Sequence, residues 1–218
     1  MKRLVYTSSS TAMTRPKPTK VFSVDTNTWN QEDVDDAWKP PPYEPSRAMA
    51  VYGASKTQAE QEVWKFVKEH HPNFTVNAVL PNANFGEILS AEQATSTGAW
   101  VPTIYNATIF PEQYKPFPPQ WMVNVTDTAL LHVAALLDPE VQNERIMAFA
   151  EPYSWNDILA VLRKLEPGKT FPEDLEGCPR DLMEVPNQRG AELLRRLGRS
   201  GWTGLEESVR ENLKHLRG

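Results

Sequence analysis

The feature that most constrains this chain is a long run of helix-forming residues that lies between two prolines. The run extends from Arg47 to His71, and Pro72 ends it because proline cannot continue a helix at an interior position. Ser46, directly before the run, is a residue type that caps helix N-termini. The sequence therefore predicts one helix of about six turns over 47–71.

Apolar side chains recur along this helix at the spacing of a single face, which predicts the face that turns toward the core. They are Met49, Tyr52, Ala59, Val63, Phe66 and Val67. Lys56 falls in the same stripe, four residues after Tyr52, so its ammonium and the phenol lie one above the other. A lysine ammonium stabilises a neighbouring phenolate and lowers the pKa of the tyrosine, which suits the pair to proton transfer near neutral pH. The alternative interpretation is ordinary packing with an extended lysine side chain.

Two predicted strands flank this helix, and each ends in polar residues. Residues 2–7 are apolar on both faces, as in a parallel sheet covered by helices, and the serines Ser8–Ser10 follow. Residues 74–80 form the second strand, which runs into Pro81 and Asn82. A serine cluster also occurs as a simple turn or cap, so its position between a strand and the long helix is what makes it a candidate site.

The order of these segments resembles the second half of an extended short-chain dehydrogenase/reductase. The segments that carry the likeness are KRLVYTSSS, YGASK, FTVNAVLPNANFG, WMVNVTDTALLHVAALLD and GWTGLEESVRENL. Within that family the chain is most similar to fungal NAD-dependent epimerase/dehydratase proteins and to dihydroflavonol reductase-like aldehyde or ketone reductases. The implied fold is α/β, the C-terminal part of a Rossmann-like doubly wound parallel sheet plus a small, mostly helical substrate-binding part. The implied division is 1–86 for the Rossmann-like half and 87–218 for the substrate-binding part, with 121–150 returning to the sheet.

The resemblance also implies roles for individual residues. Tyr52 would donate a proton to a substrate carbonyl, Ser9 would hydrogen-bond the same oxygen, and Lys56 would assist the tyrosine and hold the nicotinamide ribose. Pro81 and Asn82 would lie in a loop over the nicotinamide ring. The implied cofactor is NADP or NAD, and the implied substrate is a small aldehyde or ketone, as in an NAD(P)H-dependent reductase of secondary metabolism.

The resemblance further implies that a complete relative has segments that correspond to none in this chain. They include the glycine-rich loop that binds the cofactor pyrophosphate, so the chain is expected to be an N-terminally truncated family member. The run Gly198–Gly204 has G-x-x-G-x-x-G spacing, but it follows a predicted helix and is therefore interpreted as a turn. The strand at 2–7 would lack one neighbour, and the corresponding hypothesis is a homodimer or another partner that pairs with its free edge.

Composition narrows the range of partners. The 218 residues include 28 acidic and 23 basic side chains, for a net charge of −5, so nucleic acid is not the expected partner. The one cysteine, Cys178, excludes an intramolecular disulfide, and the histidines lack metal-ligand spacing. No apolar run approaches the roughly 18 residues of a membrane span. The sequence thus predicts a cytoplasmic protein without a metal.

Two long segments have little periodicity. Residues 11–45 are rich in proline, with one helical turn expected near 32–36, and the resemblance places them beside the substrate pocket, which Trp29 or Trp38 could line. Residues 87–120 resemble the variable substrate-binding part of the family. Their aromatic side chains either line a pocket or anchor a loop, and these are Trp100, Tyr105, Phe110, Tyr114 and Phe117.

The remainder of the chain alternates between strand and helix patterns. Strands are expected at 121–125 and 145–150, and helices at 127–137, 154–165, 190–197 and after 203. The expected N-caps are Asp127, Ser154 and Thr203, the last with Glu206 as a capping box.

Three functions are compatible with these residues. The first is the carbonyl reductase that the resemblance implies. The second is a cofactor-independent isomerase, dehydratase or cyclase that uses Ser9, Tyr52 and Lys56 in a pocket walled by the aromatic residues of 100–121. The third is an inactive family member that acts as a binding partner.

Overall fold

The centre of the molecule is a sheet of three parallel strands. The computed structural model describes residues 1–90, 92 and 95–216. The strands β1 (Arg3–Thr7), β3 (Thr75–Pro81) and β6 (Arg145–Ala148) stand in the order β1-β3-β6. β3 is the middle strand and the most buried, as its run of apolar residues predicts. β1 has an outer place in this sheet, and pairing of its free edge with a partner stays a prediction.

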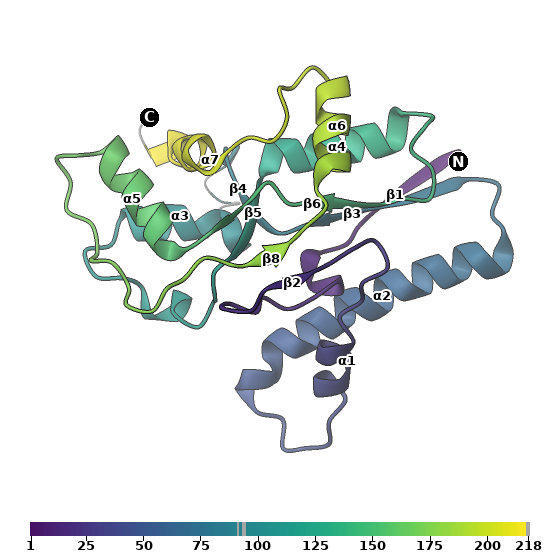
Figure 1. Ribbon diagram of the computed structural model, residues 1–218, viewed down its shortest axis with the longest axis horizontal. Coiled ribbons are helices and arrows are strands. Elements are labelled where there is room, and N and C mark those ends of the chain that lie inside the picture. Colours follow the sequence, from purple (N-terminus) through teal and green to yellow (C-terminus); the bar gives the residue numbers. More distant parts are fainter. Residues whose placement is uncertain (91, 93–94, 217–218) are drawn as a thin grey trace.

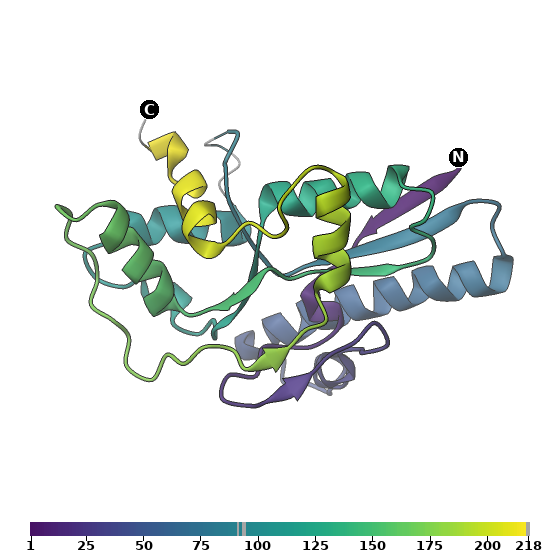
Figure 2. The same ribbon diagram turned by 45° about the horizontal axis from the view of Figure 1, so that its top comes forward.

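Helices cover both faces of this sheet, so the predicted α/β class with a parallel, Rossmann-like sheet is confirmed (Figure 1). The long helix α2 (Ala48–His70) lies on one face, and α4 (Val125–Leu137) and α6 (Gln188–Arg196) lie on the other (Figures 1 and 2). Leu131, Ala134 and Leu193 pack against Val79 on the α4 side. Alternate β-strand residues reach the two faces, which is why a strand covered on both sides is apolar throughout.

A second region extends from the end of β3. It contains β4 (Ala83–Phe85), β5 (Gln120–Asn124) and β7 (Glu151–Tyr153), in which β5 pairs parallel to β4 and antiparallel to β7. The helices α3 (Trp100–Tyr105), α5 (Trp155–Leu165) and α7 (Leu205–Asn212) gather beside this sheet (Figure 2). Their aromatic and aliphatic side chains form one continuous core.

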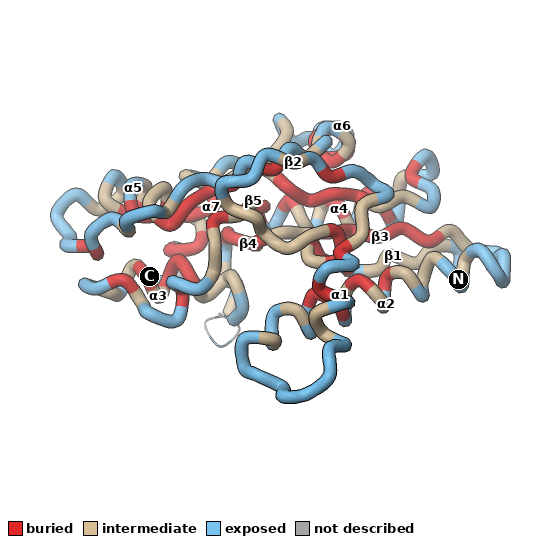
Figure 3. Tube along the Cα trace, turned by 60° about the horizontal axis from the view of Figure 1, so that its bottom comes forward, coloured by how far each residue is buried: buried red, intermediate tan, exposed pale blue. Residues whose placement is uncertain are grey.

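The proline-rich segment 11–45 is more ordered than its pattern predicts. It contains the expected helix α1 (Gln31–Ala37) and a short strand β2 (Phe22–Ser23), which pairs with β8 (Met183–Glu184). A pairing of two residues leaves no periodicity that a sequence pattern could show. The loop between α1 and α2 is exposed and projects from the molecule (Figure 3). Short 3-10 turns complete the chain: Ser10–Ala12, Pro45–Arg47, Ser96–Ala99, Glu112–Tyr114 and Lys214–Leu216.

Three of the expected N-caps are wrong. The turn at Pro45–Arg47 runs directly into α2, so Arg47 and not Ser46 precedes the helix. Asn124 caps α4, with its side chain accepting from the Thr126 N–H, one turn before the expected Asp127. Gly204 precedes α7, and the carboxylate of Glu151 accepts the Leu205 N–H in place of a capping side chain at Thr203.

The cap and turn predictions near these helices are otherwise confirmed. Ser154 caps α5 and forms a capping box with Asp157. Gly198 and Gly201 have φ values of 85° and 137°, as a turn between α6 and α7 requires. Among the described residues, no helix combines the length and the apolar character that crossing a membrane requires.

Candidate active site

The carboxyl ends of the parallel strands meet at one edge of the central sheet. Thr7 is in register with Val79, and Pro81 is in register with Ala148. The Ser8 N–H continues the ladder by donating to the Val79 carbonyl at 2.9 Å. Both predicted strand-end clusters therefore lie at the edge where α/β proteins bind ligands.

Ser9 lies at this edge with its hydroxyl oxygen fixed by Thr11. Its backbone is extended, with φ −158° and ψ 155°, and it caps the 3-10 turn Ser10–Ala12. Its Oγ accepts from the Thr11 N–H at 3.2 Å and from the Thr11 Oγ1–H at 3.0 Å. These two bonds use both lone pairs of the hydroxyl oxygen, so the Ser9 proton remains available to donate. The environment thus makes Ser9 a donor toward a ligand.

The side chains of Tyr52 and Lys56 on α2 are accessible to a ligand. The Tyr52 side chain is 46% exposed and Lys56 is half-buried. Neither side chain hydrogen-bonds or forms an ion pair with any described residue. An ammonium and a phenol one helical turn apart, neither with a partner among the described residues, form a donor pair that a bound ligand can use.

The predicted burial of this helix face is wrong. Met49 is 51% exposed and Phe66 is 46% exposed, like Tyr52 itself. The buried residues of α2 are instead small or polar: Gly53, Ala54, Thr57 and Glu60. Small side chains allow α1 and the turn after β1 to approach the helix closely, and a Cβ at Gly53 would collide with Asp33 Oδ2. Close approach, rather than hydrophobicity, selects the buried face.

The positions Tyr52, Lys56 and Glu60, each four residues apart on α2, become progressively more buried. Successive residues four apart on a helix are offset by about 40° around its axis, since each residue turns by about 100°. Exposure accordingly falls from 46% at Tyr52 to 0% at Glu60. Burial raises the pKa of Tyr6 on β1, and the nearby negative charge of Glu60 and an ionised Tyr52 raise it further. Tyr52 therefore lies within electrostatic range of β1.

Pro81 and Asn82 are at the same sheet edge, but they do not form the loop that the sequence predicts. Pro81 is the last residue of β3, and β4 begins at Ala83. Asn82 Oδ1 accepts the Ala83 N–H at 2.8 Å, and the Asn82 carbonyl accepts from Asn84 Nδ2 at 3.0 Å. The chain crosses here directly from the central sheet to the second sheet, so the junction is held rigidly.

Sequence reasoning missed a buried polar network behind this site. The Glu60 carboxylate pairs with Arg145 through Nε at 2.7 Å and Nη2 at 3.3 Å. It also accepts from Ser8 Oγ at 2.6 Å and from Trp64 Nε1 at 3.0 Å. The spacing Tyr52-Lys56-Glu60 is the signal that could have placed Glu60 beside the site. No local pattern points to Arg145, because it reaches Glu60 from a strand 85 residues away.

The aromatic residues considered for a substrate pocket serve mainly as anchors. Trp100, Phe110 and Tyr114 are 9% exposed or less, within the core of the second region. Trp29 lies under the Arg145 guanidinium, 3.8 Å from its ring centre. Trp38 is 74% exposed and donates to Gln58 on α2 at 3.0 Å. Trp100, Phe110 and Tyr114 line neither of the two pockets described below, whereas Phe117 lines one of them.

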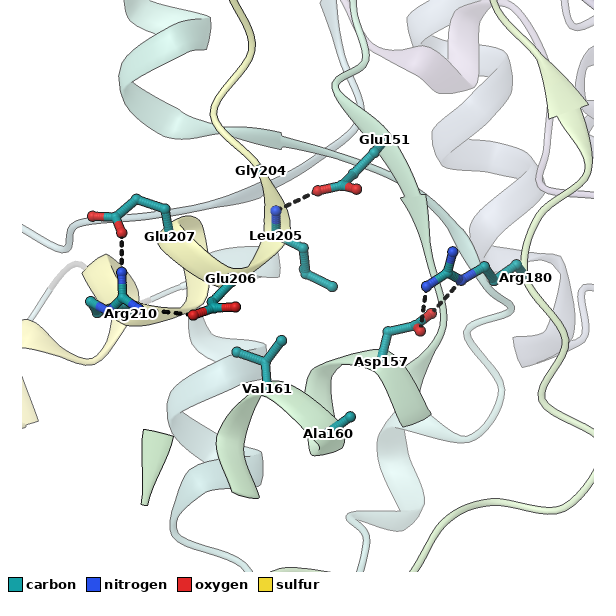
Figure 4. Close-up of a pocket in the computed structure, with 10 residues that line it drawn as sticks. All are labelled: Glu151, Asp157, Ala160, Val161, Arg180, Gly204, Leu205, Glu206, Glu207 and Arg210. Atoms are coloured by element: carbon teal, nitrogen blue, oxygen red, sulfur yellow. Dashed lines mark hydrogen bonds and ion pairs between the residues drawn. The ribbon is translucent and has the colours of Figure 1, made fainter. Parts of the chain in front are cut away.

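Two surface pockets lie away from Ser9, Tyr52 and Lys56. One, of about 560 Å³, is bounded by α5 and α7; its arginines are paired with acidic side chains of the pocket, and Glu151 accepts from the Leu205 N–H (Figure 4). Arg180 points to Asp157 and Arg210 points to Glu206 (Figure 4). The other, of about 550 Å³, is lined by Pro18, Thr19, residues 115–119, Trp155 and residues 175–179. None of the residues named for catalysis lines either pocket.

Comparison with known proteins identifies the class of reductases to which this arrangement is similar. No family model matches the chain. Aldehyde reductase 2 of Sporidiobolus salmonicolor is 39% identical over 97% of this chain and 62% of its own length. The NAD-dependent epimerase/dehydratase terH of Aspergillus terreus is 39% identical over 96% of this chain and 62% of its own length. The structure of Gre2 from Candida albicans in complex with NADPH has a TM-score of 0.79 at 19% identity, over 100% of this chain and 64% of its own.

The chain is similar over nearly its whole length to proteins named as reductases and NAD-dependent epimerase/dehydratases, and it has a Rossmann-type fold. Its relatives include fungal aldehyde reductases, ketoreductases and NAD-dependent epimerase/dehydratase proteins. The chain spans 62% of the length of the two curated relatives described above.

Proposed function

We propose that this chain carries the proton-transfer site of a nicotinamide-dependent reductase of small aldehydes or ketones. The proposal rests on Tyr52 and Lys56, which lie one turn apart on α2 and have no side-chain partner among the described residues. The same helix contacts the segment around Ser9, because Thr57 donates to the Thr11 carbonyl at 3.5 Å and Glu60 accepts from Ser8. The Ser9 oxygen accepts from Thr11, which leaves its proton to donate. The relatives named as aldehyde reductase and ketoreductase support the same reaction class. Substrate binding is assigned to 87–218 and proton transfer to 1–86.

Each side chain has a distinct task in this reaction. The Tyr52 hydroxyl donates its proton to the carbonyl oxygen as that oxygen gains negative charge. The Ser9 hydroxyl hydrogen-bonds the same oxygen and stabilises the developing charge. The Lys56 ammonium, one turn along α2, stabilises the phenolate that proton donation leaves on Tyr52. The half-exposed position of Tyr52 allows the carbonyl to reach it.

The donor groups of this edge fit part of a nicotinamide cofactor. When bound, NADPH or NADH supplies the hydride that reduces the carbonyl carbon. Lys56 and Tyr52 are free to hydrogen-bond the ribose hydroxyls, and Pro81 and Asn82 lie at the same edge for contact with the nicotinamide. The glycines at 198–204 are not assigned to the pyrophosphate, since they follow a helix and form a turn.

The test is carbonyl reduction by the purified chain with NADPH and with NADH, across a panel of small aldehydes and ketones. General acid catalysis contributes roughly 10²–10⁴-fold, so Tyr52→Phe should lower kcat by at least about 100-fold. Tyr43→Phe is the matched control, because Tyr43 is also an exposed tyrosine, 75% exposed, on the loop before α2. Full activity of Tyr52→Phe would contradict the proposal, and so would a folded chain that neither binds nor oxidises either cofactor.

A further inference from the structure

We propose that Ser8 is a positioning residue that orients Ser9 through its hydrogen bond to Glu60. The inference rests on the proposed function, because it concerns the same proton-transfer site. Ser8 would not touch the substrate, since its hydroxyl donates to Glu60 Oε2 at 2.6 Å inside the protein. Its effect would reach the substrate through the next residue in the chain.

The Glu60 carboxylate is a fixed anchor for this bond. It is 0% exposed, and it accepts hydrogen bonds from Arg145, Trp64 and Ser8. An ionised carboxylate offers about four acceptor positions, and the donors from these residues also number four. A buried charge that is satisfied in this way cannot move without losing several charge-assisted bonds at once.

Arg145 is immobilised in turn from its other side. Its Nη1 donates to the carbonyls of Thr26 and Thr28 at 2.7 and 2.9 Å. The guanidinium plane lies over the Trp29 ring at 3.8 Å. The loop before α1, the strand β6 and the helix α2 therefore converge on the single carboxylate that Ser8 contacts.

Ser8 transmits this rigidity to Ser9. Its N–H is bonded to the Val79 carbonyl at 2.9 Å, so both the main chain and the side chain of Ser8 are held. Ser9 follows with an extended backbone. In extended backbone successive side chains point to opposite sides, so the orientation of Ser8 sets that of Ser9. If the Ser8 side-chain bond were lost, only the main-chain bond to Val79 would fix the position of Ser8, and through it that of Ser9.

The same carboxylate connects the two parts of the site. Glu60 is one helical turn beyond Lys56 and two turns beyond Tyr52 on α2, while Ser8 precedes Ser9 at the end of β1. The Ser8–Glu60 bond is thus a direct polar link between the strand that carries the serine and the helix that carries the tyrosine and lysine. Displacements of about 1 Å at such sites cost about 100-fold in rate.

The test compares Ser8→Ala with Trp64→Phe in carbonyl reduction by the full chain. Both substitutions remove one hydrogen bond to Glu60, but only the Ser8 bond leads to Ser9. Ser8→Ala should lower kcat by about 10- to 100-fold while the KM for the carbonyl stays within about twofold. Trp64→Phe should leave both constants within about twofold, and Ser8→Thr, which retains the hydroxyl, should recover most of the lost kcat.

Amide hydrogen exchange gives a readout that does not depend on activity. Ser8→Ala should speed exchange at the amides of Ser8, Ala12 and Met13, which close the strand end and the turn around Ser9. Unchanged kcat in Ser8→Ala, or an equal loss in Trp64→Phe, would overturn the inference. If the native chain reduces no carbonyl, the proposed function fails, and exchange alone decides the placement: faster exchange confined to 8–13 supports it, and unchanged or uniformly faster exchange contradicts it.

Discussion

The buried face of α2 and the interior of the second region hold opposite kinds of side chain. Around α2, the buried positions hold Gly53, Thr57 and Glu60, while Tyr52 and Met49 are half exposed. In the second region, Trp100 and Trp155 are 7% and 2% exposed, at the centre of a cluster of aromatic rings. The proposed site thus leaves Tyr52 accessible, and the buried Glu60 behind it is held by hydrogen bonds of defined direction.

This difference has an energetic consequence. Aromatic burial stabilises a region in proportion to the area removed from water. The Glu60–Arg145 pair contributes less net stability, because desolvation of both charges offsets their attraction, but its bonds have defined directions. We therefore expect substitutions in the aromatic core to change mainly the free energy of unfolding, whereas Ser8→Ala, which leaves the buried ion pair intact, should change mainly the site.

The largest expected effect on stability is that of Trp155→Ala. The Trp155 ring contacts those of Trp100, Phe110, Tyr114 and Tyr153, and its Nε1 donates to the Phe117 carbonyl at 2.9 Å. Removal of a buried tryptophan leaves a large cavity, so the free energy of unfolding should fall by about 3 to 5 kcal/mol. Urea denaturation followed by circular dichroism measures this change.

Trp38→Ala is the matched control for this experiment. Trp38 is 74% exposed, and its side chain donates one hydrogen bond, from Nε1 to Gln58, so its loss should change the free energy of unfolding by about 0.5 kcal/mol or less. Similar losses in the two variants would contradict the view that the second region is held by its aromatic core.

The sequence predicted the central elements because their patterns are local. The apolar run of β3 and the helix-forming run of α2 each indicate one element, and the Tyr52/Lys56 spacing placed the two side chains on one helix face. The burial of that face was predicted wrongly, since it depends on α1, which packs on Gly53 from 20 residues away in the chain. Arg145 and the pairing of β2 with β8 were missed for the same reason, because their partners are distant in sequence.

A smaller effect on stability is expected for Gly53→Ala. Alanine favours a helix over glycine by roughly 1 kcal/mol, but here its Cβ would collide with the buried carboxylate of Asp33, whose Cγ would lie at 2.7 Å. Asp33 is held by Arg15 at 2.5 Å and by Asn30, so it cannot move aside freely. The clash should outweigh the helix preference and lower the free energy of unfolding by about 1 to 3 kcal/mol.

A double-mutant cycle isolates the clash. Asp33→Ala removes the obstructing carboxylate and leaves only a Cβ 3.0 Å from the new Cβ, so adding Gly53→Ala to that variant should be much less destabilising than in the native chain. Additive effects of the two substitutions, measured by urea denaturation, would mean that α1 does not pack on α2 at Gly53.

The smallest effect is a dependence of stability on pH that comes from the exposed side of α1. Hydrogen bonds from Lys39 and Arg15 lower the pKa of Asp36 from its ordinary value of 3.8 to about 2. Because the pKa of Asp36 is lower in the folded state, its contribution to stability is complete above about pH 4 and is lost as the pH falls toward about 2. Asp36→Asn should therefore flatten the decline in unfolding free energy across that window.

The pKa of the neighbouring Asp33 is shifted in the opposite direction, so its effect on stability has the opposite dependence on pH. Burial raises the pKa of Asp33, so its protonation favours the folded state, and stability from this group is lost as the pH rises through that pKa. Asp33 is present in both the native chain and Asp36→Asn, so subtracting their unfolding free energies removes its contribution. It should also shrink in roughly 1 M salt, which screens the exposed pairs of Asp36 with Lys39 and Arg15. An equal slope in both proteins between about pH 4 and pH 2 would show that these ion pairs do not hold α1 beside the site.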